Sequence, residues 1–167
     1  MDYQAENLIL HFVTEDDLPE VARTWPSGHH PLSDGQARGA VAYMTGNHGR
    51  NTKGCIYHLC HAVCRAEEPR TIMGWCGLDG RRSHTEPEIF ILLDEPYRGK
   101  GYGTLCVKKL LRIASEDYLL PGVHGSCAKE NTASARAMEK GGMVRYGEQE
   151  NGDPLFRFTA EESPGMS

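Results

Sequence analysis

The sequence predicts an α+β domain in which helices pack on a layered sheet, and two observations support this. Strand-like and helix-like stretches are mixed along the chain, and pairs of strands joined by short turns are expected near both of its ends. A regular doubly wound sheet would instead need strands and helices that alternate throughout. The 167 residues suit one compact domain, which we expect to span 1–160 with a flexible tail at 161–167.

The first half of the chain is expected to hold one strand, two helices and a pair of strands. Thr14 followed by Asp17 is a weak form of a helix-capping box, and Trp25-Pro26-Ser27-Gly28 ends the helix that Thr14 starts. Ser33 starts a second helix, which Gly46-Asn47-His48-Gly49 is expected to close. The elements predicted here are strand 7–13, helices 14–25 and 33–45, and an antiparallel pair of strands at 55–65 and 71–78.

The second half is expected to hold a central strand, two helices and three further strands. The stretch 88–93 is almost entirely apolar, which predicts a central strand covered on both faces. Leu105, Leu110, Leu111 and Ala114 are spaced as a core-facing stripe of a helix over 102–115. The remaining predicted elements are strand 123–128, helix 132–140 ended by two glycines, and strands 143–147 and 155–158 joined by an Asn-Gly turn.

Composition and charge exclude several classes of function. A formal net charge of -5 argues against a nucleic-acid partner, because proteins that bind nucleic acids are usually basic. No apolar run reaches the roughly 20 residues that a membrane span needs, and the N-terminus does not resemble a signal peptide. We therefore expect a cytoplasmic protein without membrane contacts, whose six cysteines are reduced.

The most informative segment is the glycine-rich loop Arg98-Gly99-Lys100-Gly101-Tyr102-Gly103-Thr104, which follows an apolar strand and opens a helix. Glycines let the backbone turn tightly, and the free N–H groups of a helix start attract an anion such as a pyrophosphate. A dinucleotide-binding loop would place its third glycine one residue later, and a Walker loop would follow Gly-Lys with Ser or Thr. The pattern that remains is Arg-x-x-Gly-x-Gly.

Two segments resemble the GNAT superfamily of acetyltransferases, in particular its Rim-type branch of N-terminal acetyltransferases. Residues 88–103 resemble the central motif of that branch, with a glutamate, an apolar strand, an acidic and proline-containing turn and the glycine loop. Residues 131–143 are similar to the second motif, although Met143 stands where phenylalanine is usual. The likeness covers 88–147 well and the preceding residues only in the order of their elements.

The resemblance implies the architecture and the cosubstrate. We expect a mixed, mostly antiparallel central sheet flanked by helices, splayed between the strands at 88–93 and 123–128 so that acetyl-coenzyme A enters the gap. A main-chain N–H near Leu92 or Leu93 would polarise the thioester carbonyl. Asn131 either contacts the pantetheine arm or caps the helix that follows it. The cofactor-binding residues implied are Leu92, Leu93, Arg98, Gly99, Lys100, Gly101, Tyr102, Gly103, Thr104, Asn131 and Ser134.

Acetyl transfer to an amine needs a base for the amine and a proton for the departing thiolate. The resemblance makes Glu88 the leading base, and Glu86 is its rival because it points to the same face of a regular strand. Many relatives carry a tyrosine as the acid where this chain has Met138, which cannot donate a proton. Tyr146, Tyr97 or solvent remain as candidates for the acid, and Tyr146 is the residue we select.

Several cysteines and histidines have side chains that could form a further site. Cys55, His58, Cys60, His61 and Cys64 do not follow the spacing of a zinc site and divide between two faces of a strand, so no metal is expected. Cys127 is read as a packing residue because direct transfer needs no cysteine nucleophile. His29 and His30 lie in a loop at 26–35 that, together with 147–154, is expected to contact the acceptor.

These observations favour an N-acetyltransferase that transfers an acetyl group from acetyl-coenzyme A to a primary amine, either a peptide N-terminus or a small molecule, by direct attack. The alternative is a non-catalytic acyl-coenzyme A sensor that keeps the glycine loop without turnover. The partner that we expect is the amine acceptor, and a homodimer is a further option.

Overall fold

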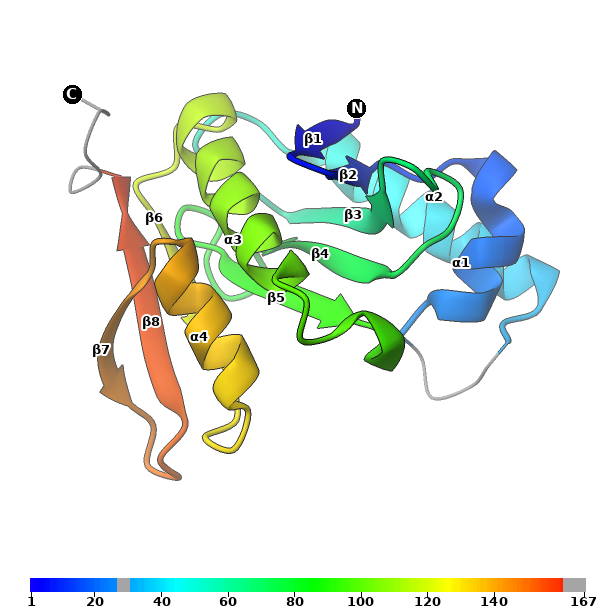
Figure 1. Cartoon of the computed structure of the whole chain (residues 1–167). Coiled ribbons are helices and arrows are strands. Elements are labelled where there is room, and N and C mark those ends of the chain that lie inside the picture. The colour runs from blue at the N-terminus through cyan, green and yellow to red at the C-terminus, as the bar shows by residue number, and fades with distance from the viewer. Residues whose placement is uncertain (27–30, 161–167) are drawn as a thin grey trace.

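The computed structural model describes residues 1–26 and 31–160, so the predicted tail and His29-His30 lie outside the described residues. One sheet holds eight strands in the order β1-β2-β3-β4-β5-β6-β8-β7 (Figure 1). All neighbouring strands are antiparallel except β5 and β6. The strands are β1 Tyr3–Ala5, β2 Leu8–His11, β3 His58–Arg65, β4 Gly74–Asp79, β5 Glu88–Leu93, β6 Gly122–Ser126, β7 Val144–Glu148 and β8 Pro154–Thr159. The predicted mixed, mostly antiparallel α+β sheet is confirmed.

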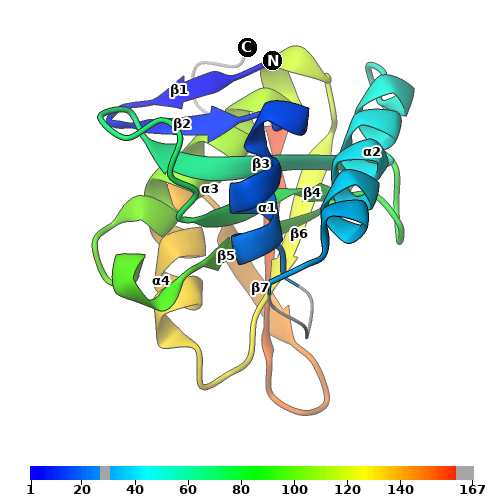
Figure 2. The ribbon, with the colours of Figure 1, turned by 90° about the vertical axis from the view of Figure 1, so that its right-hand side faces the viewer.

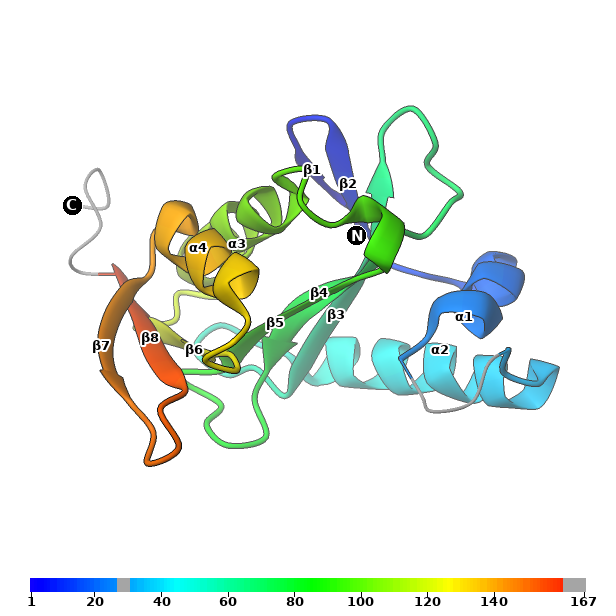
Figure 3. The same ribbon diagram turned by 60° about the horizontal axis from the view of Figure 1, so that its bottom comes forward.

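Four α-helices cover the two faces of this sheet, with α3 and α4 on one face and α1 and α2 on the other (Figure 2, Figure 3). A 3-10 turn, η2, leads from β5 into the glycine loop, and a π-helical turn follows α3. Within the described residues, none of the helices is long and apolar enough to cross a membrane. The elements are α1 Leu18–Thr24, α2 Asp34–Arg50, η2 Glu95–Tyr97, α3 Tyr102–Arg112, the π-turn Ile113–Asp117 and α4 Thr132–Gly141.

Two hydrophobic cores hold the layers together. On one face, Val107 and Leu110 of α3 join a cluster with Leu59, Leu78 and Ile89 of the sheet, all at most 5% exposed. The predicted stripe of α3 therefore does face the core. Burial of each such side chain stabilises the fold by about 1.5–3 kcal/mol relative to exposure.

On the other face, Val21 of α1 and Met44 of α2 pack with Cys60, Cys64 and Trp75 of the sheet. This second core is smaller, and it leaves part of the sheet surface uncovered beside α1 and α2. The two cores thus differ in how completely they cover the strands, and this difference leaves part of β5 exposed.

The burial of β5 differs from the prediction. We expected this strand to be covered on both faces, but Leu92 is 49% exposed and lines a pocket, and Phe90 lines the same pocket at the border of the second core. The strands with the most complete burial are β3 and β4. The apolar run of β5 therefore reflects a core on one face and a binding surface on the other.

Two further predictions about the secondary structure were wrong. Helix α2 continues through Gly46 and Gly49 to Arg50, although we expected those glycines to end it. Each interior glycine costs about 1 kcal/mol in helix propensity, and the burial of Val41 and Met44 offsets that cost. Strand β1 was missed because its three residues are too few to show a pattern.

The splay between β5 and β6 is confirmed. These parallel strands share one register pair, Glu88 with His124, and the N–H of His124 donates to the carbonyl of Pro87 at 2.9 Å. Beyond that pair the two strands separate, as Figure 1 shows. The backbone groups on that edge of β5 are therefore left without a partner strand from Ile89 onward.

The alternation of an antiparallel ladder tells which amides of β5 face this gap. The N–H of Asp94 donates to the carbonyl of Met73 at 2.8 Å, across the β4 side. Since successive residues alternate in direction, the N–H of Leu92 also points toward β4, whereas those of Ile91 and Leu93 point into the gap. Leu93 rather than Leu92 thus offers a main-chain donor there.

Candidate active site

The glycine loop adopts a conformation that favours glycine. Gly99 has φ 75° and Gly101 has φ 84°, values in the left-handed region that other residues rarely adopt. A Cβ added at either position would meet nothing within 4 Å, so the requirement is conformational rather than steric. The loop therefore keeps open space over its backbone, as the approach of a ligand requires.

The start of α3 presents unused donors to that space. Gly101 is the N-cap and offers no side chain to the helix start. The N–H groups of Tyr102, Gly103 and Thr104 find no acceptor in the part of the chain that the structure describes. Together with the helix dipole, these donors form a site suited to an anion such as a pyrophosphate.

Two of the predicted cofactor residues also have a structural role. The Nε of Arg98 donates to the carbonyl of Leu93 at 2.9 Å, which ties the loop to the end of β5. The side chain of Asn131 accepts from the N–H of Ser134 at 3.1 Å and so caps α4. Of the two roles considered for Asn131, capping is present in the structure, while Lys100 stays exposed at the loop.

Glu88 lies at the point where the two strands separate. Its carboxylate accepts a hydrogen bond from Ser126 Oγ on β6 at 3.2 Å, and Arg82 lies 4.0 Å away on its other side. The side chain is 37% exposed, so it remains open to a ligand. Ser126 was not singled out in the sequence, because its contact depends on the register of two strands far apart in the chain.

Glu86 is engaged elsewhere. It forms an ion pair with Arg157 of β8, and its other carboxylate oxygen lies 3.3 Å from His124 Nε2. The hydrogen bond from Arg157 lowers the pKa of Glu86, which favours its ionised form. Because its oxygens already have partners, Glu86 has less to offer an amine than Glu88.

A hydrogen-bonded chain leads from Glu86 to Tyr146. His124 Nδ1 lies 3.3 Å from the Tyr146 hydroxyl, while its Nε2 faces Glu86. Tyr146 is 54% exposed and sits at an irregularity in the pairing of β7 with β8. His124 is a residue that sequence reasoning missed, since only the register pair with Glu88 identifies it.

The position of the usual acid and the other candidate tyrosine lie apart from these hydrogen-bonded residues. Met138, at the position of the usual acid, is buried, and a Cβ added at Gly125 would lie 2.6 Å from its sulfur, so this position fills the core between α4 and β6. Tyr97 is partly buried against the larger core. Of the tyrosines considered, Tyr146 is the one hydrogen-bonded to the group of polar residues next to Glu88.

The cysteine and histidine cluster divides between the faces of β3, as expected. Cys60 and Cys64 are buried toward α1 and α2, and burial raises the pKa of each thiol to about 12. His61 faces the other way, and burial lowers its pKa to about 4. Over residues 1–26 and 31–160, no three metal-ligating side chains gather to hold an ion. Burial also raises the pKa of Cys127, which disfavours the thiolate of a nucleophile.

A pocket of about 480 Å³ lies on the face of the sheet beside α1 and α2. Glu88 lines it together with aromatic side chains and with polar residues of β4 and the connection to β5. Its volume is in the usual range for small-molecule sites. The polar lining consists of His58, Asp79, Arg81, Arg82 and Glu88.

Comparison with solved structures supports the fold. A ribosomal-protein-alanine acetyltransferase from Vibrio fischeri matches with a TM-score of 0.77 and 16% identity, covering 97% of this chain and 98% of that one. RimL, a ribosomal-protein α-N-acetyltransferase in complex with coenzyme A, matches with a TM-score of 0.71 and 14% identity over 95% and 98% of the two chains. An acetyltransferase from Agrobacterium tumefaciens matches at 0.69 and 20%, covering 95% and 94%.

A search of curated protein sequences found no match. The family model of the acetyltransferase (GNAT) domain matches residues 7–144, most of the chain, which confirms the resemblance seen in its motifs. Acetyltransferases of this fold use acetyl-coenzyme A, and the gap, the glycine loop and the free amides fit that cosubstrate. The chain therefore belongs to the GNAT family and is an acetyl-CoA-dependent acetyltransferase.

Proposed function

We propose that the chain is an N-acetyltransferase whose acceptor is a primary amine, either a small molecule or a peptide N-terminus. The position of Glu88 carries this proposal, since it marks the end of the β5–β6 pairing and also lines the pocket. A carboxylate at this junction faces an amine in the pocket on one side and an acetyl group in the gap on the other. The fold likeness to RimL, which acts on protein α-amines, is consistent with an amine acceptor.

The cofactor is assigned to the gap and the glycine loop. The pyrophosphate lies over the backbone from Arg98 to Thr104, where unused N–H groups and the positive end of the α3 dipole favour negative charge. Lys100 adds a positive side chain. The pantetheine arm follows the unpaired edge of β5 toward the start of α4, where Asn131 and Ser134 lie.

Direct attack needs three contributions from this chain. The carboxylate of Glu88 takes a proton from the amine through a bridging water, because residues 88 and 93 are roughly 16 Å apart along the strand. The amine nitrogen then bonds to the acetyl carbon. The N–H of Leu93 donates to the carbonyl oxygen as negative charge develops there, while the side chain of Leu92 contributes to the pocket wall. The carbon–sulfur bond then breaks, and the coenzyme A thiolate takes up a proton.

Tyr146 is our choice for the donor of that proton. Its hydroxyl is hydrogen-bonded to His124, which is in turn bound to Glu86. A histidine held between a carboxylate and a phenol can pass a proton to the phenol oxygen as the phenol releases its own. The hydrogen-bonded series of Glu86, His124 and Tyr146 thus gives Tyr146 a route for reprotonation after each turnover.

An amine screen tests the proposed function. The purified protein is mixed with acetyl-coenzyme A and pools of amino acids, peptides and polyamines, and thiol release is followed while mass spectrometry identifies the product. We expect at least one pool to yield an N-acetylated product. If coenzyme A binds but no pool is turned over, the assignment of a primary amine as the acceptor is wrong.

A further inference from the structure

The pocket beside Glu88 has a polar end and an apolar end, and the strand register defines both. His58, Asp79 and Glu88 are successive partners across β3, β4 and β5, and all three line the pocket. Two residues further along β5 comes Phe90, and two further again comes Leu92, opposite Trp75. A ligand whose amine reaches Glu88 therefore extends its remaining atoms over an apolar surface.

Aromatic side chains form most of that surface. Phe90 lies over Gly77, where a Cβ would come within 2.9 Å of the phenyl ring. Trp25 meets Trp75 edge to face with ring centroids 4.9 Å apart. Tyr43 approaches His58 from α2 at 5.4 Å. Such a surface favours a flat or bulky apolar group, because aromatic pairs are stabilised beyond the burial of their area.

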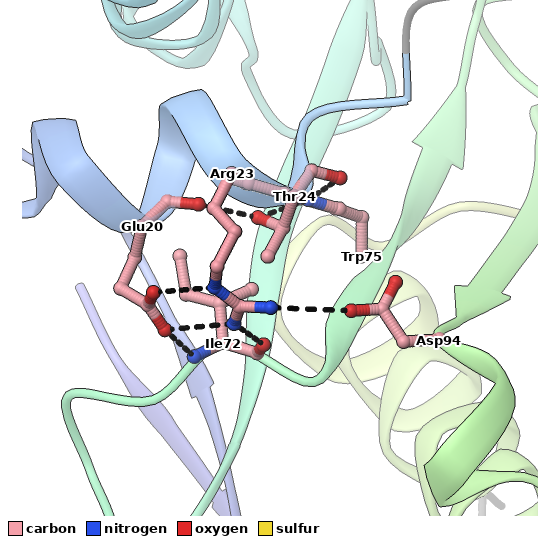
Figure 4. A network of polar contacts seen from close by, with 6 residues as sticks. All are labelled: Glu20, Arg23, Thr24, Ile72, Trp75 and Asp94. Atoms are coloured by element: carbon pink, nitrogen blue, oxygen red, sulfur yellow. Dashed lines mark hydrogen bonds and ion pairs between the residues drawn. The ribbon is translucent and has the colours of Figure 1, made fainter. Parts of the chain in front are cut away.

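Trp75, which supports the aromatic wall, is bonded to the end of α1, as Figure 4 shows. The indole Nε1 of Trp75 donates to both the carbonyl and the hydroxyl of Thr24 at 3.2 Å. Arg23 bonds Glu20 at 2.7 Å and the carbonyl of Ile72 at 2.9 Å, which anchors the helix to the chain before β4. A wall held in this way loses little entropy when a ligand binds.

The charges at the polar end are not equivalent. Asp79 is paired closely with Arg81, at 2.6 Å, so these two charges largely satisfy each other. Arg82 is 86% exposed and approaches Glu88 only at 4.0 Å. An ammonium at Glu88 therefore has a cation beside it that is free to bind an anionic group of the same molecule.

We propose, on the basis of the proposed N-acetyltransferase function, that the acceptor is a free α-amino acid with an aromatic or large apolar side chain. Its ammonium faces Glu88, its carboxylate lies at Arg82, and its side chain packs on Phe90 and on Trp25, which the buried Trp75 supports. An α-amino acid carries its ammonium and its carboxylate on the same carbon atom, so both charges can reach the closely spaced Glu88 and Arg82. A polyamine would place a second cation near Arg81 and Arg82, and the amine end of a long peptide has no adjacent carboxylate.

Matched acceptors test this inference. The value of kcat/KM is measured for L-phenylalanine, its amide, L-alanine and a peptide that begins with phenylalanine. We expect L-phenylalanine to exceed its amide by roughly two- to fivefold, because an ion pair with the exposed Arg82 contributes up to about 1 kcal/mol. It should exceed L-alanine by at least tenfold. An amide or a peptide acetylated as well as the free amino acid overturns the proposal while leaving the N-acetyltransferase function intact.

Two variants assign the preference to the residues named. Arg82→Gln should bring the ratio between L-phenylalanine and its amide close to one, whereas Arg112→Gln, on exposed α3 surface, should leave it unchanged. Trp25→Ala should reduce the preference for phenylalanine over alanine. The rise in melting temperature with coenzyme A shows that each variant is folded. If Arg82→Gln keeps the wild-type ratio, the carboxylate assignment is wrong.

Discussion

Replacing Glu88 by glutamine tests the base most directly. The amide keeps the size of the side chain, and its oxygen can still accept the hydrogen bond from Ser126 that is 3.2 Å long in the wild type. Arg82 lies 4.0 Å away and is highly exposed, so losing that ion pair costs little. The change therefore removes proton acceptance and leaves the geometry almost intact.

The expected loss follows from that removal alone. A positioned base contributes about a hundredfold or more to the rate, equivalent to about 2.7 kcal/mol in the barrier. Affinity for coenzyme A should remain within a factor of about two, because the pyrophosphate site at Gly99–Thr104 is formed by backbone of the next segment. Raising the pH should partly restore turnover, since more of the amine is then neutral.

The assay is thiol release at saturating acetyl-coenzyme A with the best acceptor found in the screen, because a poor surrogate makes another step limiting. Glu86→Gln is the matched control. Since Glu86 is bound to Arg157 and His124, its replacement should lower the rate only a few-fold through Tyr146. Wild-type turnover by Glu88→Gln near neutral pH would refute the assignment of the base.

Three further predictions follow from the same structure. Gly101→Asp should abolish the rise in melting temperature caused by coenzyme A, because it adds bulk and negative charge at φ 84°, whereas Gly35→Asp at the start of α2 should leave the rise unchanged. Tyr146→Phe should lower kcat roughly tenfold or more; His124→Gln should act similarly, and the double variant should be no worse than either single one, so additive losses would contradict a shared chain. Burial lowers the pKa of His61 from 6.5 to about 4, so between these values the unfolded state binds a proton that the folded state does not. The free energy of unfolding should therefore fall as the pH drops from 6.5 toward 4, by about 2 kcal/mol at pH 5. Chemical denaturation of His61→Phe should show less of this loss than the wild type.

Local patterns predicted most of the fold. Some features depend only on residues that are close together in the sequence, and these could be identified from the sequence alone. They are the glycine loop, the stripe of α3 and the glycines after α4. The end of α2 was misjudged because its packing outweighs the weak propensity of Gly46 and Gly49. The splay itself came from the family resemblance, not from any periodicity.

The polar residues around Glu88 were the part that sequence reasoning missed. Ser126 reaches Glu88, and His124 reaches Tyr146, through the order of β5, β6, β8 and β7 in the sheet, which differs from their order in the chain. Nothing in the residues near His124 signals this, since a single histidine in a short strand is compatible with many roles. The choice between Leu92 and Leu93 likewise depended on which edge of β5 is bonded to β4.

The two faces of β5 have different functions, so activity depends on which residues of the strand point to each face. Alternate residues serve opposite sides: Glu88, Phe90 and Leu92 line the pocket, while Ile89 packs in the core of α3. Inserting or deleting one residue within β5 would turn the carboxylate toward the core and exchange the amides at the gap with those bonded to β4. Such a change would remove both substrate sites at once. Substitutions keep the frame of the strand, so new acceptors are expected to arise by replacing pocket side chains in β5 and in the segments that face it.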